Sequence, residues 1–122
     1  MQKQPSIFVI EDAIELANIF AEILEMNGMT VEIIGDGAVA MQRLGADTPD
    51  LILLDMHLPN VSGVEILDYV RSAPHLTNTK VVAVTANPLL SADLEEKADL
   101  LLIKPVRYTQ ISELVTRLMT SK

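Results

Sequence analysis

Five short segments of the chain are rich in large apolar residues and are separated by longer, more polar stretches. They span Ile7–Ile10, Thr30–Ile34, Leu51–Leu54, Lys80–Val84 and Leu100–Ile103. Leu51–Leu54 is an uninterrupted apolar run between turn-forming residues, a pattern typical of a strand buried on both faces. Thr30–Ile34 contains Glu32, so we predict it at an edge of the sheet, where a charge can reach water.

Apolar residues recur at helical spacing between and after these strands. Helices are predicted over residues 13–27, from Asp36-Gly37 onward, from Ser62 to before Pro74, over an acid-rich stretch at 92–97, and around Ile111, Leu114, Val115 and Leu118. We expect Asp12 to cap the first helix and Ser62, with Glu65, to cap the third. Five strands alternating with five helices predict a parallel sheet with right-handed crossovers and helices on both faces.

The composition indicates one globular domain with an aliphatic core. The chain has 122 residues, 49% hydrophobic and only 3% aromatic, so methionines should contribute to the core. We place there Met26, Met29, Met41 and Met119. The formal net charge is -8, without a cluster of Lys or Arg, so we expect no direct nucleic-acid binding. The absence of cysteine excludes disulfides and thiolate chemistry.

The beginning of the chain is polar and leads into a short apolar run. Met1-Gln-Lys-Gln-Pro-Ser6 precedes the four apolar residues of the first strand, which are far too few for a signal-peptide core or a membrane span. We therefore expect no membrane insertion and a cytoplasmic location.

Ionisable and hydroxyl side chains stand at the C-terminal ends of four predicted strands. They are Glu11, Asp12, Asp55, Thr85 and Lys104. Because the carboxyl ends of parallel strands meet at one edge of a sheet, where such folds bind ligands, we expect these side chains to form one site. An aspartate that ends a buried strand is rarely left without a partner, a hydrogen bond or a metal.

Three carboxylates at this edge would repel one another. Glu11, Asp12 and Asp55 should therefore retain a proton or bind a cation. Carboxylate oxygens, a backbone carbonyl and waters suit Mg²⁺, which commonly bridges protein to phosphate. The lack of thiolates, with only His57 nearby, argues against zinc.

The remaining two residues suit phosphoryl chemistry. Lys104 could hold one phosphoryl oxygen and the Thr85 hydroxyl another, while Asp55 could act as a nucleophile that forms an acyl phosphate. In the structural alternative, Lys104 and Asp55 form an ion pair and Thr85 caps the next segment. Each residue alone is compatible with both interpretations, whereas all five at successive strand ends favour function.

Four segments, in this order, resemble the motifs of the receiver domain of two-component response regulators. They are Glu11-Asp12, Asp55-Met-His-Leu-Pro59-Asn-Val-Ser-Gly63, Thr85-Ala86 and Lys104-Pro105. The resemblance covers nearly the whole chain and implies an α/β fold, the flavodoxin-like doubly wound (βα)5 sandwich with a five-stranded parallel sheet of order 2-1-3-4-5. It also implies that residues 1–122 form a single receiver domain, with no output domain in this chain.

The same resemblance implies a phosphorylation switch. Asp55 would accept a phosphoryl group from a sensor histidine kinase, a histidine phosphotransfer protein or a small phosphodonor, and Thr85 and Lys104 would bind the phosphoryl oxygens. The implied Mg²⁺ ligands are Glu11, Asp12, Asp55 and the backbone carbonyl of His57. Phosphorylation would change binding to a downstream protein. The chain would catalyse only its own phosphorylation and dephosphorylation, and would not otherwise be an enzyme.

The chain departs from the family pattern at three places. One is Val106, which follows Lys104-Pro105 where the family often has Phe. Leu101 stands where many receivers carry a Tyr or Phe that turns inward on activation. The interval from Thr85 to Lys104 is shorter than usual by about one helical turn, which predicts a trimmed fourth helix. The last two departures leave open a receiver-like scaffold that binds partners without phosphorylation. An aspartate-nucleophile phosphatase would need a second acid where this chain has His57, whose side chain we interpret as an exposed loop histidine.

Overall fold

The computed structural model describes residues 4–87, 89 and 91–120, and within them five strands form one parallel sheet. The strands are β1 (Ser6–Ile10), β2 (Thr30–Ile34), β3 (Leu51–Asp55), β4 (Lys80–Thr85) and β5 (Leu100–Ile103). Their order is β2-β1-β3-β4-β5, and each neighbouring pair is parallel. The predicted fold class, strand order and edge position of β2 are confirmed. Residues 1–3, 88, 90 and 121–122 of the predicted domain lie outside the described residues.

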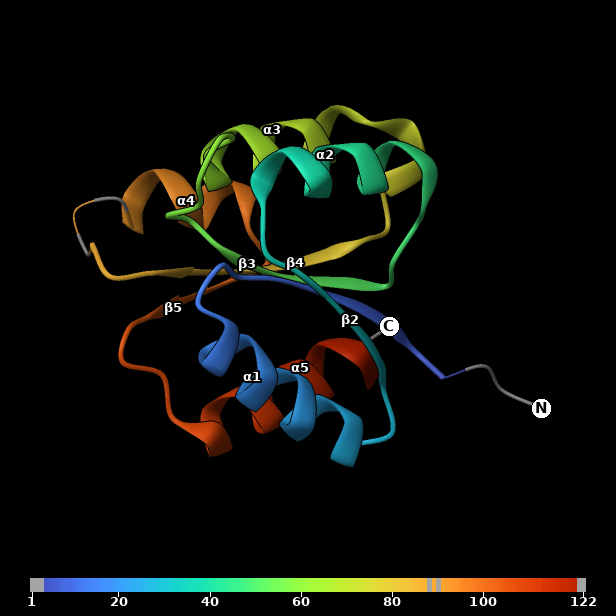
Figure 1. Cartoon of the computed structure of the whole chain (residues 1–122), viewed down its shortest axis with the longest axis vertical. Coiled ribbons are helices and arrows are strands. Elements are labelled where there is room, and N and C mark those ends of the chain that lie inside the picture. The colour runs from blue at the N-terminus through green and yellow to red at the C-terminus, as the bar shows by residue number, and fades with distance from the viewer. Residues whose placement is uncertain (1–3, 88, 90, 121–122) are drawn as a thin grey trace.

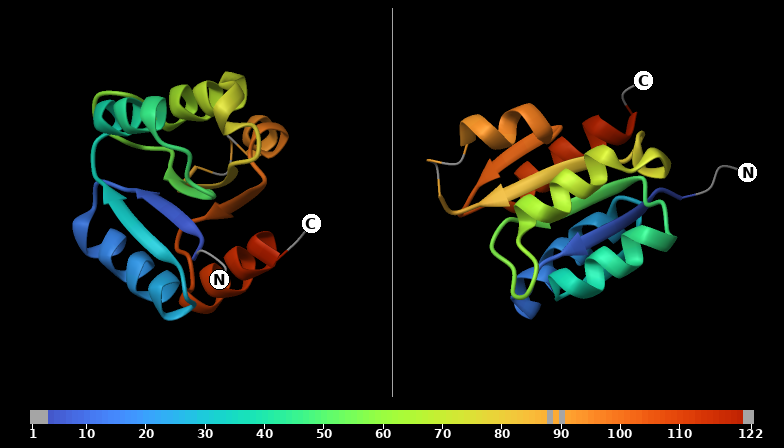
Figure 2. Two further views of the ribbon diagram at one scale, coloured as in Figure 1. Left: turned by 90° about the vertical axis from the view of Figure 1, so that its right-hand side faces the viewer. Right: turned by 90° about the horizontal axis from the view of Figure 1, so that it is seen from above.

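Within the described part of the chain, the α-helices cover both faces of this sheet. They are α1 (Ile14–Met26), α2 (Gly37–Ala46), α3 (Gly63–Ser72), α4 (Ser91–Lys97) and α5 (Tyr108–Thr120), with a 3-10 turn η1 (Pro74–Leu76) before β4. Helices α2, α3 and α4 lie on one face, and α1 and α5 lie on the other (Figures 1 and 2). Among the described helices, none combines the length and hydrophobicity needed to cross a bilayer.

Alternation along the central strands divides the core into two apolar layers. On β1, Phe8 and Ile10 pack with residues of α2 and α3, whereas Ile7 and Val9 pack with residues of α1 and α5. Every residue of β3 is buried, which explains why its sequence is an unbroken apolar run up to Asp55. The last residue of β3 is thus held in place by apolar packing on both sides of the sheet.

The edge strand β2 accommodates its charge at the surface. Glu32 is exposed and forms an ion pair with Arg43 of α2. The Arg43 guanidinium also lies over the Phe8 ring, with its central carbon 5.3 Å from the ring centroid. Polar residues therefore cover the open edge of the sheet beside the core, a common protection of edge strands.

Two local expectations about α1 are wrong. Asp12 does not cap the helix, because Ala13 occupies the N-cap position without a side-chain cap. The Ala13 N–H instead donates to Glu11 Oε2 at 3.2 Å. The carboxylate at the start of the helix is therefore that of Glu11 and not that of Asp12. Met26 is 81% exposed rather than part of the core, because it lies two residues past the buried Leu24 and hence on the opposite side of the helix.

Candidate functional site

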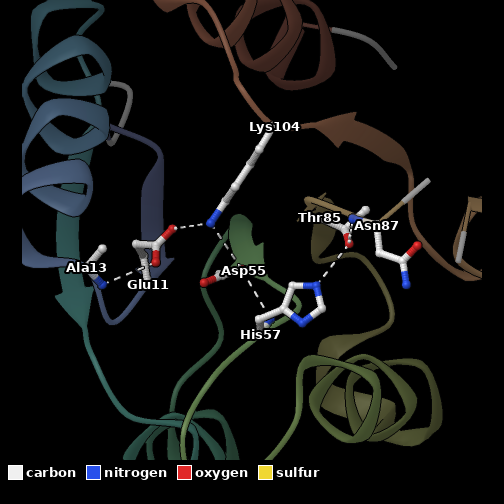
Figure 3. A network of polar contacts seen from close by, with 7 residues as sticks. All are labelled: Glu11, Ala13, Asp55, His57, Thr85, Asn87 and Lys104. Carbon is white, nitrogen blue, oxygen red and sulfur yellow. Dashed lines mark hydrogen bonds and ion pairs between the residues drawn. The ribbon is translucent and has the colours of Figure 1, made fainter. Parts of the chain in front are cut away.

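Four of the five residues proposed from the strand ends, all but Asp12, are drawn in Figure 3, and they come together at the carboxyl edge of the sheet. Asp55 and Thr85 are the last residues of β3 and β4, and Glu11 and Lys104 directly follow β1 and β5. The chain order of the strands reverses between β1 and β3, and an open α/β sheet binds its ligands at such a switch point. Asp55 therefore lies at the centre of the expected binding edge.

Glu11, Asp12 and Asp55 form an acidic cluster. Each offers one carboxylate oxygen, and these three atoms all lie within 4.8 Å of one another. Glu11 and Asp55 are each only 3% exposed, whereas Asp12 is exposed. An all-oxygen set that is open on the Asp12 side suits a hard divalent cation that keeps several waters, as Mg²⁺ does.

Glu11 is a much weaker acid than usual. Its pKa rises from the ordinary 4.5 to about 7, chiefly because burial disfavours the charged form and secondly because its side chain shares a hydrogen bond with Asp55. The hydrogen bond from the Ala13 N–H and the charge of Lys104 oppose this rise. Near neutral pH, the acidic cluster without a cation is therefore partly protonated at Glu11.

Lys104 places its ammonium group between the two buried carboxylates. Its Nζ lies 3.5 Å from Glu11 Oε1 and 3.5 Å from Asp55 Oδ1. Both distances are longer than the roughly 2.7–2.9 Å typical of a strong charge-assisted hydrogen bond. The ammonium is thus shared between two partners, and with three N–H donors it can also bind a further anionic oxygen.

The loop after β3 is held close to the sheet. Asp55 Oδ1 accepts a hydrogen bond from the His57 N–H at 3.1 Å, so the chain turns back over the carboxylate. Asn60 has a left-handed backbone with φ of 70°. Gly63 packs so tightly that a Cβ at this position would lie 2.5 Å from the Cα of Met56. This packing fixes the backbone that surrounds Asp55.

Thr85 is fully buried, and two loop residues contact its hydroxyl (Figure 3). The hydroxyl oxygen accepts a hydrogen bond from the Asn87 N–H at 3.0 Å, which is the local cap expected in the structural alternative. It also lies 3.3 Å from His57 Nε2. The His57 side chain is exposed, as expected, but its ring reaches Thr85 across the site. This contact was not predicted.

Residues 7–116 match the family model of the response regulator receiver domain. The chain belongs to this family. It is a receiver domain of two-component signalling, and therefore a signalling switch rather than a catalytic enzyme. Its acidic cluster is consistent with the phosphoacceptor site of a receiver.

Several known receivers are similar to this one. The DNA-binding response regulator MtrA of Mycobacterium tuberculosis H37Rv is 30% identical over 105 residues, which cover 86% of this chain and 46% of MtrA. The chain thus spans about half the length of this relative. The signal receiver domain of the LuxO repressor protein from Vibrio parahaemolyticus aligns with a TM-score of 0.87 at 26% identity, over 96% of this chain and 91% of that one. TrrA from Thermotoga maritima, in complex with Mg²⁺-BeF, has the same fold. It aligns with a TM-score of 0.84 at 24% identity, over 94% of this chain and 99% of TrrA.

Two of the departures from the family pattern lie on the α4 side of the fold. Leu101 packs, half-buried, against the apolar layer beneath α2 and α3. Helix α4 spans seven residues, so the expected short helix is confirmed. Two ion pairs tie α3 to the C-terminal end of α4 and to the short segment between α4 and β5. Lys97 Nζ lies 2.7 Å from Asp68 Oδ1, and Arg71 Nη2 lies 2.8 Å from Asp99 Oδ2.

Proposed function

We propose that this receiver is a phosphorylation-dependent switch in which Asp55 accepts the phosphoryl group. The observation that carries the proposal is the setting of its carboxylate. Asp55 ends the central strand, lies in a cluster with two other carboxylates, and has the Lys104 ammonium 3.5 Å away. This setting combines a fixed nucleophile with groups that can compensate the charge of a phosphoryl group.

The proposed phosphodonor is a phosphohistidine on a sensor histidine kinase or a histidine phosphotransfer protein. An Asp55 carboxylate oxygen attacks phosphorus, the phosphorus–nitrogen bond breaks, and the electron pair returns to the donor imidazole. The product is an acyl phosphate on Asp55. The Lys104 ammonium and the Thr85 hydroxyl then bind oxygens of the phosphoryl group. Positioning and charge compensation account for most of the rate.

The acidic cluster fits Mg²⁺. The proposed ligands are carboxylate oxygens of Glu11, Asp12 and Asp55 and the backbone carbonyl of His57. When bound, the cation offsets negative charge on the transferring phosphoryl group. The all-oxygen composition of the cluster and its opening toward water support this assignment. The complex of TrrA with Mg²⁺-BeF, on the same fold, agrees with it.

Phosphorylation by a small donor tests the proposal. Wild-type protein incubated with acetyl phosphate and Mg²⁺ should gain the mass of one phosphate, as measured by intact-protein mass spectrometry. Asp55→Asn should gain none, while Asp68→Asn, which changes an exposed aspartate on α3, should behave as wild type. EDTA should suppress the gain. Unmodified wild-type protein after treatment with several phosphodonors would contradict the proposal.

The α4 side of the fold supports a second candidate, a receiver-like scaffold that binds partners without phosphorylation. Leu101 lacks the aromatic ring found in many receivers, and α4 is short. A scaffold has no need of a cation site, so the two candidates differ in Mg²⁺ affinity. Calorimetric titration should give binding that Asp12→Asn and Asp55→Asn each weaken. Binding of Mg²⁺ that is absent, or unchanged in both variants, would favour the scaffold.

We further propose that the phosphorylated receiver acts on a downstream protein and that it does so in the cytoplasm. The net charge of -8 favours a protein target over nucleic acid. The cytoplasmic location follows from the proposed donor, because phosphohistidine on a kinase derives from ATP. Capture of a partner by phosphorylated but not by Asp55→Asn protein would support the first point.

A further inference from the structure

The Thr85 hydroxyl is buried, so its hydrogen-bond partners must be neighbouring protein groups. Thr85 is 0% exposed, so water does not satisfy it. A hydroxyl offers one proton and two lone pairs. The Asn87 N–H already donates to the oxygen at 3.0 Å, so the hydroxyl proton still needs an acceptor, because leaving it without one in the interior is costly.

The His57 ring lies within reach of that proton and can act as the acceptor. Its Nε2 lies 3.3 Å from Thr85 Oγ1, and a neutral imidazole with its proton on Nδ1 offers a lone pair at Nε2. The two residues come from different loops, 28 positions apart in the chain. Figure 3 shows the imidazole lying between Asp55 and Thr85. With this tautomer of His57, the hydroxyl proton is directed at the ring rather than at an oxygen of the acidic cluster.

Position 101 provides no competing hydrogen bond. Leu101 lies on β5, next to Ala83 of β4, and its side chain carries no polar atom. Beyond its own loop, the Thr85 hydroxyl contacts His57. His57 belongs to the loop that directly follows Asp55 at the end of β3.

We propose that His57 is a positioning residue that holds the Thr85 hydroxyl in the unphosphorylated state and is released when Thr85 turns to the phosphoryl group. This inference rests on the proposed function, because it requires a phosphoryl group on Asp55 whose oxygen takes over the Thr85 proton. A single hydroxyl proton cannot serve both acceptors, so the two hydrogen bonds exclude each other. Release of the exposed imidazole then marks phosphorylation at the surface of the β3–α3 loop.

The hydrogen bond between His57 and Thr85 should weaken the binding of a phosphoryl analogue, since a ligand binds less tightly when its competent state is less populated. The probe is beryllofluoride with Mg²⁺, titrated calorimetrically at constant pH. His57→Leu should bind it about three- to tenfold more tightly than wild type, which is the range expected for losing one net hydrogen bond. His57→Gln, whose amide oxygen can accept the same proton, should stay within about twofold of wild type.

A double-mutant cycle separates this role from a general structural effect. Thr85→Val should weaken binding, and adding His57→Leu to it should change nothing further, because the hydroxyl is gone. His75→Leu is the matched control. His75 is part of η1, which precedes β4 and therefore lies at the opposite end of the sheet from the site. Its Nε2 lies 2.7 Å from the Leu44 carbonyl oxygen. This substitution should leave beryllofluoride affinity unchanged. In nitrogen NMR spectra, beryllofluoride should shift the His57 ring resonances and not those of His75.

The possible failures are distinguishable. Binding in His57→Leu that is equal to or weaker than in wild type would overturn the inference while leaving the proposed function intact. An equal gain from His57→Leu in the Thr85→Val background would also overturn it, because the effect would not pass through the hydroxyl. Wild-type protein that binds no beryllofluoride and gains no phosphate would remove the proposed function and this inference with it.

Discussion

Replacing Glu11 by glutamine should change how the stability of the protein depends on pH. The folded chain holds Glu11 at a pKa of about 7, against an ordinary value of 4.5. Between these values, the folded state binds a proton that the unfolded state has lost, so the free energy of unfolding falls as pH rises. The contribution of Glu11 is fully present below about pH 4.5 and is lost as pH rises to about 7 and beyond.

The size of this effect follows from the interval between the two pKa values. One pH unit corresponds to about 1.4 kcal/mol, so the interval from 4.5 to about 7 amounts to about 3 kcal/mol. Glu11→Gln has no such proton to lose. Without divalent cations, it should therefore become more stable relative to wild type, by about 2–3 kcal/mol, as pH rises from about 5 to about 8.

Urea denaturation in EDTA, followed by circular dichroism across this pH range, measures the difference. Glu22→Gln removes an exposed carboxylate from α1 and should keep the pH dependence of wild type. Adding Mg²⁺ at about pH 8 should stabilise wild type more than Glu11→Gln, because the cation binds the ionised cluster of the folded state alone. Parallel stability profiles of wild type and Glu11→Gln would refute the assignment of a buried, protonated Glu11.

Two matched pairs of substitutions test the packing of the fold, one beside the site and one at the opposite end of the sheet. Gly63→Ala would place a Cβ 2.5 Å from the Cα of Met56 and should cost about 2–3 kcal/mol in urea unfolding, whereas Gly45→Ala, with its nearest contact at 3.8 Å, should stabilise the helix by about 0.5 kcal/mol. Thr79→Val removes a buried hydroxyl that donates to a carbonyl oxygen at 2.7 Å, and should cost about 1–2 kcal/mol. Thr77→Val removes an exposed hydroxyl and should stay within about 0.5 kcal/mol of wild type. Equal effects within either pair would show that the described packing does not determine stability.

The fold could be predicted because each strand is visible in the sequence as a short segment rich in apolar residues. Apolar runs that alternate with helical patterns predict a parallel sheet, and Glu32 identifies one of its two edges, that of β2. The site could be predicted in outline for the same reason, since parallel strands bring Glu11, Asp55, Thr85 and Lys104 to one edge whatever the details of the loops.

The details that were missed depend on which way individual side chains turn. Asp12 and Glu11 are adjacent acids, and propensity could not show that Glu11 is the one that bonds the helix start. The contact between His57 and Thr85 joins two loops through tertiary structure, so no local pattern indicates it. Met26 was assigned to the core by residue type, although its helical position places it in water.

The most direct test of the central claim is to locate the phosphoryl group. Borohydride reduces an aspartyl phosphate to homoserine, so protein treated with acetyl phosphate and Mg²⁺, then reduced and fragmented in a mass spectrometer, reports the modified residue. We predict homoserine at position 55, and none when Mg²⁺ is removed by EDTA. Homoserine at Asp12 or another aspartate, or an unmodified Asp55 in protein that has gained a phosphate, would contradict the account.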